Sequence, residues 1–247
     1  MGEDDVKLIA RFTELAERAE RTSRYTQTKF LNMAEQSALL RLRLPCPFAL
    51  TGGYEGAERR LAYFGSEEQT GYAFEPPVAC IEAAPLNDRF SDELTHRDFL
   101  GALMALGIVR EVLGDIVVSG NRGYIFCLDS VADYIVENLT EVKRTSIVCR
   151  VCDTPEFAFE ERRRESLVVP SERLDAVIAA VYKLPREKAK ALCEKGLVFA
   201  DAKQVLKGGA QLTEGAIVSV RGSGRFRFIG LERETKKGKL RVTVEIY

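Results

Sequence analysis

The sequence predicts an α+β protein in three parts: a helical N-terminal domain (1–76), a mixed middle domain (77–155) and a C-terminal domain (170–247). Apolar residues recur at helical spacing in the first part, whereas strand-length apolar runs alternate with helical segments after Pro77. Charge is also unevenly distributed, because residues 170–247 carry a net +7 and residues 1–169 a net −8. A chain of 247 residues is long enough for domains of this number and size.

The N-terminal part is predicted to contain two amphipathic helices. Residues 4–21 place apolar side chains on one helical face, and residues 30–42 repeat the pattern until Pro45 and Pro47 end it. A glycine-rich segment follows over residues 52–56 and predicts a tight turn that leads into a short helix or strand.

The middle part is predicted to alternate strands and helices. Thr95 and Asp98 have the spacing of a capping box at the start of a helix, and Ser130 is the predicted N-cap of a second helix. Predicted strands precede, separate and follow these helices, at residues 78–84, 114–120, 123–129 and 146–152. The order β-α-β-β-α-β is that of ferredoxin-like domains. Many RNA-recognition domains share it, although Tyr124 and Phe126 alone do not complete the aromatic consensus of their sheets.

A charged segment at residues 156–169 is predicted to be a linker, bounded by Pro155 and Pro170. Beyond it, Ser171 is the predicted N-cap of one short helix, and Pro185 is expected in the first turn of a second. Four strand-like runs follow, at residues 197–200, 216–221, 226–232 and 240–247. The C-terminal domain is therefore predicted to be two short helices and a small antiparallel sheet.

Basic residues on these helices, turns and hairpins are the candidate phosphate ligands, because cations held at defined spacing on rigid elements suit structured RNA. The predicted RNA-binding residues are Arg173, Arg186, Lys188, Lys190, Lys203, Lys207, Arg221, Arg225 and Arg227. A solvated basic face is the alternative interpretation of the same charges.

Several ordered motifs resemble the S-four RNA-binding domain over roughly 60 residues. They are Arg173-Leu174-Asp175, Lys183-Leu184-Pro185-Arg186, Ala189-Lys190-Ala191-Leu192, Glu194-Lys195-Gly196, Val198 and Ser219-Val220-Arg221-Gly222. The segments 52–60, 95–103, 114–116 and 219–228 are similar to signatures of the bacterial YlmH family, whose plastid and cyanobacterial relatives are photosystem II S-four domain proteins.

The YlmH resemblance implies a cytoplasmic factor with an RNA-recognition-like middle domain and a C-terminal S-four domain. From the polarised charge and the S-four motifs, we predict that this factor is not an enzyme. It implies binding to ribosomal RNA and tRNA on the large ribosomal subunit, in ribosome-associated quality control of stalled translation. It also makes Tyr54, Arg59 and Arg60 candidates for a secondary RNA contact, against ion pairs of the arginines with Glu55 or Glu58.

The sequence departs from the family pattern at three places. Pro185 stands where a serine is usual, Asp201 stands where an asparagine is usual, and residues 30–36 differ from the expected pattern. An acid at Asp201 would repel a phosphate, so Asp201 is not a predicted ligand.

Catalytic and metal-binding interpretations find little support. Cys149 and Cys152 are spaced as a CxxC pair, but a zinc site usually needs two more ligands, and positions i and i+3 of a strand point to opposite faces. His96 has no recognisable nucleophile motif nearby. We therefore predict no cofactor, no metal, no membrane span and a monomer. An RNA-modifying enzyme of pseudouridine synthase type, or its targeting module, and a protein–protein adaptor remain the alternatives.

Overall fold

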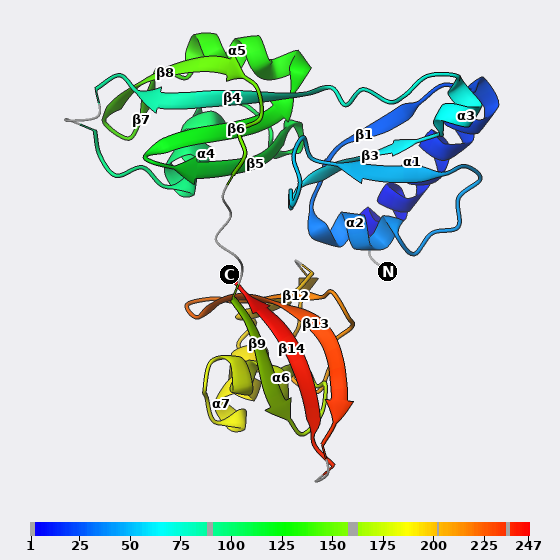
Figure 1. Cartoon of the computed structure of the whole chain (residues 1–247), viewed down its shortest axis with the longest axis vertical. Helices are drawn as coiled ribbons and strands as arrows, with labels where there is room; N and C mark the ends of the chain where they lie inside the picture. The colour runs from blue at the N-terminus through cyan, green and yellow to red at the C-terminus, as the bar shows by residue number, and fades with distance from the viewer. Residues whose placement is uncertain (1–2, 88–90, 158–162, 202, 236–237) are drawn as a thin grey trace. The chain divides into compact units, whose positions relative to one another are not determined.

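The computed structural model contains helices and antiparallel sheets in two compact units, Met1–Glu156 and Phe157–Tyr247 (Figure 1). It describes residues 3–87, 91–157, 163–201, 203–235 and 238–247. The α+β class predicted from the sequence is confirmed. In the described part of the chain, no helix has the length and apolar content that crossing a bilayer requires.

The first 76 residues form a small sheet with helices rather than a purely helical domain. Their elements are α1 (Glu3–Thr22), β1 (Thr26–Leu31), α2 (Met33–Leu39), β2 (Phe48–Thr51), β3 (Arg60–Phe64) and α3 (Glu67–Thr70). The strands are antiparallel in the order β1-β3-β2, and α1 packs Phe12 and Ala16 into a core shared with Phe64 of β3. The helix predicted at residues 4–21 is confirmed, but the prediction of a helical domain missed this sheet.

Asn32 explains why the second predicted helix begins late. Its side-chain oxygen accepts hydrogen bonds from the backbone N–H groups of Ala34 and Glu35, at 2.8 and 3.0 Å. The Glu35 carboxylate accepts in return from the Asn32 backbone N–H at 2.6 Å, which completes a capping box. The cap separates β1 from α2, so Phe30 and Leu31, which also fit helical spacing, belong to the strand.

The middle part of the first unit follows the predicted order of elements, with one additional two-residue strand, Glu141–Val142, that was not predicted. They are β4 (Val78–Pro85), α4 (His96–Ala105), β5 (Leu113–Ser119), β6 (Arg122–Leu128), α5 (Ala132–Asn138), β7 (Glu141–Val142) and β8 (Thr145–Cys152). All pairings are antiparallel, in the order β5-β6-β4-β8-β7. Both helices pack on one face, where Phe99, Leu103 and Ile135 meet Ile81 and Ile125 of the central strands.

The two predicted caps of this part have different outcomes. The Asp98 carboxylate accepts from the Thr95 backbone N–H and hydroxyl, at 2.8 and 2.6 Å, and α4 begins as predicted. Ser130 is not an N-cap, because it lies in a 3-10 turn over Asp129–Val131 that leads into α5. Val131 therefore occupies the cap position.

The second unit is a six-stranded antiparallel sheet with two short helices on one face. Its elements are β9 (Arg163–Val169), α6 (Leu174–Val181), α7 (Arg186–Glu194), β10 (Val198–Ala200), β11 (Lys203–Gln204), β12 (Ile217–Val220), β13 (Gly224–Glu234) and β14 (Leu240–Ile246). The strand order is β11-β10-β12-β13-β14-β9. Val177 and Ile178 of α6 join Phe226 and Phe228 of β13 in its core.

The predicted linker at residues 156–169 is wrong over its second half. Residues 163–169 form β9, which pairs with β14 along its whole length, from Val169 opposite Leu240 to Arg163 opposite Ile246. The charges that favoured a linker are accommodated because the strand lies at the sheet edge, where Arg164 reaches Glu245 at 3.1 Å. Residues 158–162 lie outside the described part of the chain.

Helix α6 begins three residues after the predicted cap, Ser171. Arg173 occupies the N-cap position, and no cap hydrogen bond comes from its side chain. The first helical N–H groups instead donate to a loop that follows much later in the sequence. Leu174 N–H donates to the carbonyl of Ala210 at 2.8 Å, and Asp175 N–H to that of Gly208 at 2.9 Å. A long-range partner therefore replaces the local side chain.

Candidate nucleic-acid interface

Asp175 joins the two helices of the second unit through a pair of arginines. It lies in the first turn of α6 and is 2% exposed. Arg173 donates to it from Nε and a terminal nitrogen, at 3.2 and 3.0 Å. Arg186, the first residue of α7, donates through the same two kinds of atom at 3.3 Å each. One buried carboxylate thus orients both guanidinium groups.

The carboxylate is charged in this setting. Burial alone would raise the pKa of Asp175, but hydrogen bonds from Arg173 and Arg186 outweigh it and hold the pKa below its ordinary value. Each arginine uses two of its five N–H donors on Asp175, and each side chain is 46% exposed. The outward donors of a guanidinium in such a position suit a phosphate oxygen.

The loop that starts at Lys207 packs against the same helix ends. Gly208 lies so close that an added Cβ would stand 3.1 Å from the Asp175 Cβ and 3.5 Å from the Lys190 Cα. Lys190 is exposed one turn after Arg186, and its Nζ lies 3.6 Å from Glu194 on the surface. Such an exposed pair is weak and leaves the lysine able to exchange partners. We call Arg173, Arg186, Lys190 and Lys207 the helix face.

Two predicted lysines lie apart from the helix face. Lys188 is exposed on α7, two positions from both Arg186 and Lys190, and residues at that spacing do not share a helical face. Lys203 is exposed on the edge strand β11. Asp201, excluded above, accepts from the Ile217 N–H at 2.9 Å and so has a structural role in the turn.

The remaining predicted arginines lie on or beside the opposite face of the sheet. Arg225 and Arg227 alternate along β13 with Phe226 and Phe228, which are buried under the helices. Arg221 follows the last residue of β12, and its guanidinium carbon lies 4.9 Å from the Phe199 ring centroid. The structure therefore places these arginines on a different surface from the helix face, with Lys188 and Lys203 on neither, instead of gathering the predicted ligands on one surface.

The predicted secondary contact is an internal connection within the first unit. The Tyr54 hydroxyl donates to Asp115 Oδ2 at 2.7 Å, and the backbone N–H groups of Glu58 and Arg59 donate to the same carboxylate at 2.6 and 3.0 Å. Arg60 Nε donates to the carbonyl of Ala57 at 2.6 Å. We call Tyr54, Glu58, Arg59 and Asp115 the latch, because it joins the glycine-rich loop to β5.

Arg59 is committed to backbone carbonyls rather than to Glu55 or Glu58. Its guanidinium donates to the carbonyls of Leu113, Phe30 and Arg110, at 2.9, 3.1 and 3.0 Å. Burial, the largest cause, lowers the pKa of Arg59, while nearby acids oppose that shift. Neither predicted role fits this geometry, so we withdraw Arg59 as an RNA ligand and interpret it as a connector of β1, β3 and β5.

The aromatic residues of the middle sheet do not form an exposed pair. Phe126 is fully buried and packs on Tyr54, with ring centroids 4.6 Å apart. Gly53 makes this contact possible, since a Cβ there would stand 3.0 Å from the Phe126 ring. Tyr124 is half-buried beside Glu82, which Arg122 and Arg150 neutralise at 3.0 and 2.5 Å. The glycine-rich loop therefore covers part of the face that RNA-recognition sheets expose.

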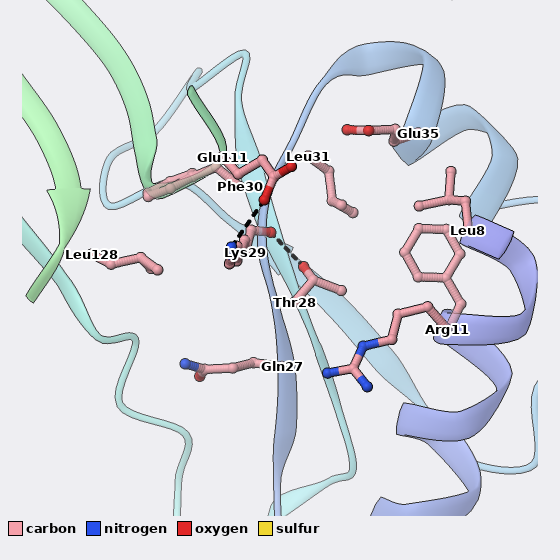
Figure 2. A pocket seen from close by; sticks show the side chains of 11 residues that line it. Leu8, Arg11, Gln27, Thr28, Lys29, Phe30, Leu31, Glu35, Glu111 and Leu128 are labelled. Atoms are coloured by element: carbon pink, nitrogen blue, oxygen red, sulfur yellow. Dashed lines mark hydrogen bonds and ion pairs between the residues drawn. The ribbon is translucent and has the colours of Figure 1, made fainter. Parts of the chain in front are cut away.

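A pocket of about 480 Å³ opens beside α1 and β1 in the first unit (Figure 2). Its wall combines apolar side chains such as Leu8 with the charged Arg11 and an ion pair of Lys29 and Glu111 at 2.9 Å. None of the residues predicted to bind RNA lines this pocket.

Thiols and carboxylates do not assemble a metal centre among the described residues, where no group of three candidate ligands was found. Cys149 and Cys152 lie on opposite faces of β8, as strand geometry predicts. Cys149 packs toward the helices, and Cys152 faces Cys80 with the sulfur atoms 3.7 Å apart. Burial raises the pKa of Cys149 to about 12, which makes that thiol inert at neutral pH.

Sequence reasoning missed the partners that organise these residues. Asp175 and Asp115 entered the sequence-based interpretation as members of the motifs at residues 173–175 and 114–116, without predicted partners. A signal existed for Asp175, because an apolar α6 sequence leaves its charge to be buried, and Arg173 stands two residues before it. Asp115 had no local signal, since its partners lie 56 to 61 residues away.

The fold is that of an α+β protein. Asp175, which is buried, holds two arginines at the ends of the two short helices, and this surface suits phosphate groups. A family model described as "Putative RNA-binding domain in YlmH" matches residues 84–156, in the middle part of the chain. The ribosome-associated protein quality control protein P2 of Bacillus subtilis (strain 168) is 33% identical over 226 residues, which cover 88% of this chain and 86% of that protein.

The chain belongs to the YlmH family, which the identity and coverage of this relative establish. Among solved structures, the cell division protein ylmH from Streptococcus pneumoniae is similar, with a TM-score of 0.48 and 19% identity. That similarity covers 62% of this chain and 93% of the pneumococcal chain.

Proposed function

We propose that this protein is a monomeric, non-enzymatic RNA-binding factor that binds ribosomal RNA and tRNA on the large ribosomal subunit. Its process would be ribosome-associated quality control of stalled translation, in the cytoplasm. The relative from Bacillus subtilis carries that process in its name, and the matched family model describes an RNA-binding domain. The proposal for this chain rests on one structural observation, the helix face organised by Asp175.

The helix face supports phosphate binding for three reasons. Arg173 and Arg186 are oriented by a buried carboxylate, so less freedom is lost when they contact a phosphate. Lys190 is exposed close to them, which adds a further cation. The surrounding segment 170–247 carries a net +7, so it attracts polyanions at long range, whereas the rest of the chain repels them.

Co-sedimentation in a sucrose gradient tests the proposal. Large subunits that carry peptidyl-tRNA, and vacant large subunits as a comparison, are mixed with the protein at low salt. We expect the wild type in the subunit fractions, with more bound when peptidyl-tRNA is present. The double variant Arg186→Glu, Lys190→Glu should remain at the top of the gradient, whereas Arg41→Glu, which changes an exposed arginine of the first unit outside residues 84–156, should sediment as the wild type does. Wild-type protein that stays at the top in every sample would contradict the proposal.

Two further measurements address the alternatives. Nuclease treatment releases a factor held by RNA, but an adaptor bound to ribosomal protein stays on the remaining particles. Mass spectrometry of ribosomal RNA and tRNA nucleosides from a deletion strain should match the parent strain, since we propose no catalysis. A modified nucleoside missing only from the deletion strain, and restored by the gene, would instead establish the RNA-modifying enzyme.

A further inference from the structure

The face of the C-terminal sheet opposite the helices carries a cross-strand row of polar and aromatic residues. Phe199 of β10 pairs with Ser219 of β12, and Ser219 pairs with Arg225 of β13. Tyr247 continues the row, because its backbone N–H donates to the carbonyl of Arg225 at 3.0 Å. Directly opposite residues lie on the same face of a sheet, so these four side chains form one strip. We call this strip, with Arg221, the outer row.

Each aromatic ring of the outer row has a guanidinium over it. The Arg221 guanidinium carbon lies 4.9 Å from the Phe199 ring centroid, and that of Arg225 lies 5.9 Å from the Tyr247 centroid. Arg225 Nε also donates to the Ser219 hydroxyl at 3.1 Å, which orients the side chain between the two rings. Tyr247 is 39% exposed and Arg221 is exposed, so solvent reaches both ends of the strip.

The charge around the outer row is positive. Arg227 lies on the same face, one row along the sheet, opposite Glu245. Glu245 is 7% exposed and pairs with Arg164 at 3.1 Å. Asp201, beside Ile217 at the end of this second row, accepts from the Ile217 backbone N–H at 2.9 Å, so each of these carboxylates already has a partner. Cations next to accessible rings are the combination that binds single strands, because bases stack on rings or guanidinium planes while phosphates contact the charges.

We propose that the outer row is a second RNA-binding surface, which takes unpaired nucleotides by stacking while the helix face takes the phosphates of structured RNA. The inference rests on the proposed function, because it supposes an RNA partner. It goes further by assigning a different surface and a different class of RNA to the outer row. Two surfaces on opposite faces of one small sheet would let the domain hold a structured element and an adjoining single strand together.

Fluorescence anisotropy of the full chain with a labelled 12-nucleotide oligouridine tests this inference, because oligouridine is unpaired. Tyr247→Ala should weaken binding about fivefold or more, the lower bound expected for loss of one stacked base. The salt dependence of oligouridine binding should be the same for Tyr247→Ala as for the wild type, since the tyrosine ring is uncharged. Tyr247→Phe should bind as the wild type does. Arg225→Gln should weaken binding and reduce the salt slope by about 0.7, the value for one phosphate contact on a single strand.

Control variants and competitors determine how each result is read. Tyr72→Ala removes an exposed tyrosine of the first unit outside residues 84–156 and should leave affinity unchanged. Equal affinity of Tyr247→Ala and wild type, or equal losses for Tyr247→Phe and Tyr247→Ala, would overturn the inference. Competition by poly-glutamate as effective as by oligouridine would overturn it too, because the surface would then recognise acidic protein. If Arg186→Glu, Lys190→Glu abolishes co-sedimentation while Tyr247→Ala keeps full oligouridine affinity, the proposed function stands and this inference falls.

Discussion

Arg186 and Asp175 are eleven residues apart, on different helices, and are joined by two hydrogen bonds of 3.3 Å. Asp175 is 2% exposed, whereas nearly half of the Arg186 side chain reaches solvent. The pair therefore links the interior of the second unit to its surface. Stability and RNA binding should both depend on it.

Replacing Asp175 by asparagine should destabilise the second unit. The change removes a buried charge that holds Arg173 and Arg186. A hydrogen bond to a charged group contributes about 1.5–3 kcal/mol to the free energy of unfolding. We expect a fall of several degrees in the melting temperature followed by circular dichroism. Glu187→Gln, which removes an exposed acid from the first turn of α7, should change stability by no more than about 1 kcal/mol, the contribution of a charge at a helix N-terminus. Equal melting temperatures for Asp175→Asn and wild type would show that the network carries no stability.

The contribution of Asp175 should also depend on pH. The pKa of Asp175 is lower in the folded protein than in the unfolded chain, where the pKa of an aspartate is about 3.9. A depressed pKa stabilises the fold above the unfolded value, and this stabilisation is lost as pH falls through the folded value. The stability difference between wild type and Asp175→Asn should therefore be constant near neutral pH and shrink below about pH 4. A stability difference between wild type and Asp175→Asn that grows on acidification would contradict the lowered pKa of Asp175.

The latch should stabilise the first unit without contributing to RNA affinity. Asp115→Asn weakens three hydrogen bonds, so we expect a loss of about 1–3 kcal/mol in the free energy of unfolding by urea. Tyr54→Phe removes one of them and should cost about 1 kcal/mol. Asp153→Asn alters an exposed acid of the same unit and serves as the control. A loss of RNA affinity in Tyr54→Phe at unchanged stability would restore the secondary RNA contact predicted from the sequence.

Local patterns predicted much of the fold because the physics they express is local. The capping box of Thr95 and Asp98 and the apolar face of α1 depend on residues three or four apart, and both are present. Strand β9 and the start of α6 depend instead on distant partners, β14 and the carbonyls of Gly208 and Ala210. Residue spacing within the segment carries no information about such pairings, so a linker and a Ser171 cap were predicted instead.

The candidate site also combines features that local sequence patterns predict with features that depend on distant partners. Charge identified the candidate cations in the sequence, and Arg186 and Lys190, four residues apart, lie on one face of α7. The sheet placed Arg225 and Arg227 on the opposite face, because β13 alternates its side chains and buries the phenylalanines under the helices. Charge and spacing could not separate these cations into different surfaces, because that separation depends on which face of the sheet the helices cover.

The salt dependence of RNA binding by helix-face variants tests the central claim most directly. The measurement is anisotropy with a structured hairpin of ribosomal RNA sequence, between 50 and 200 mM salt, for wild type, Lys190→Gln, Lys207→Gln and the control Arg41→Gln. Each helix-face variant should bind more weakly at every salt concentration and show a slope reduced by about 0.9, the value for one phosphate contact on a duplex. Affinities and slopes equal to those of the wild type and of Arg41→Gln would contradict the assignment of the helix face to RNA.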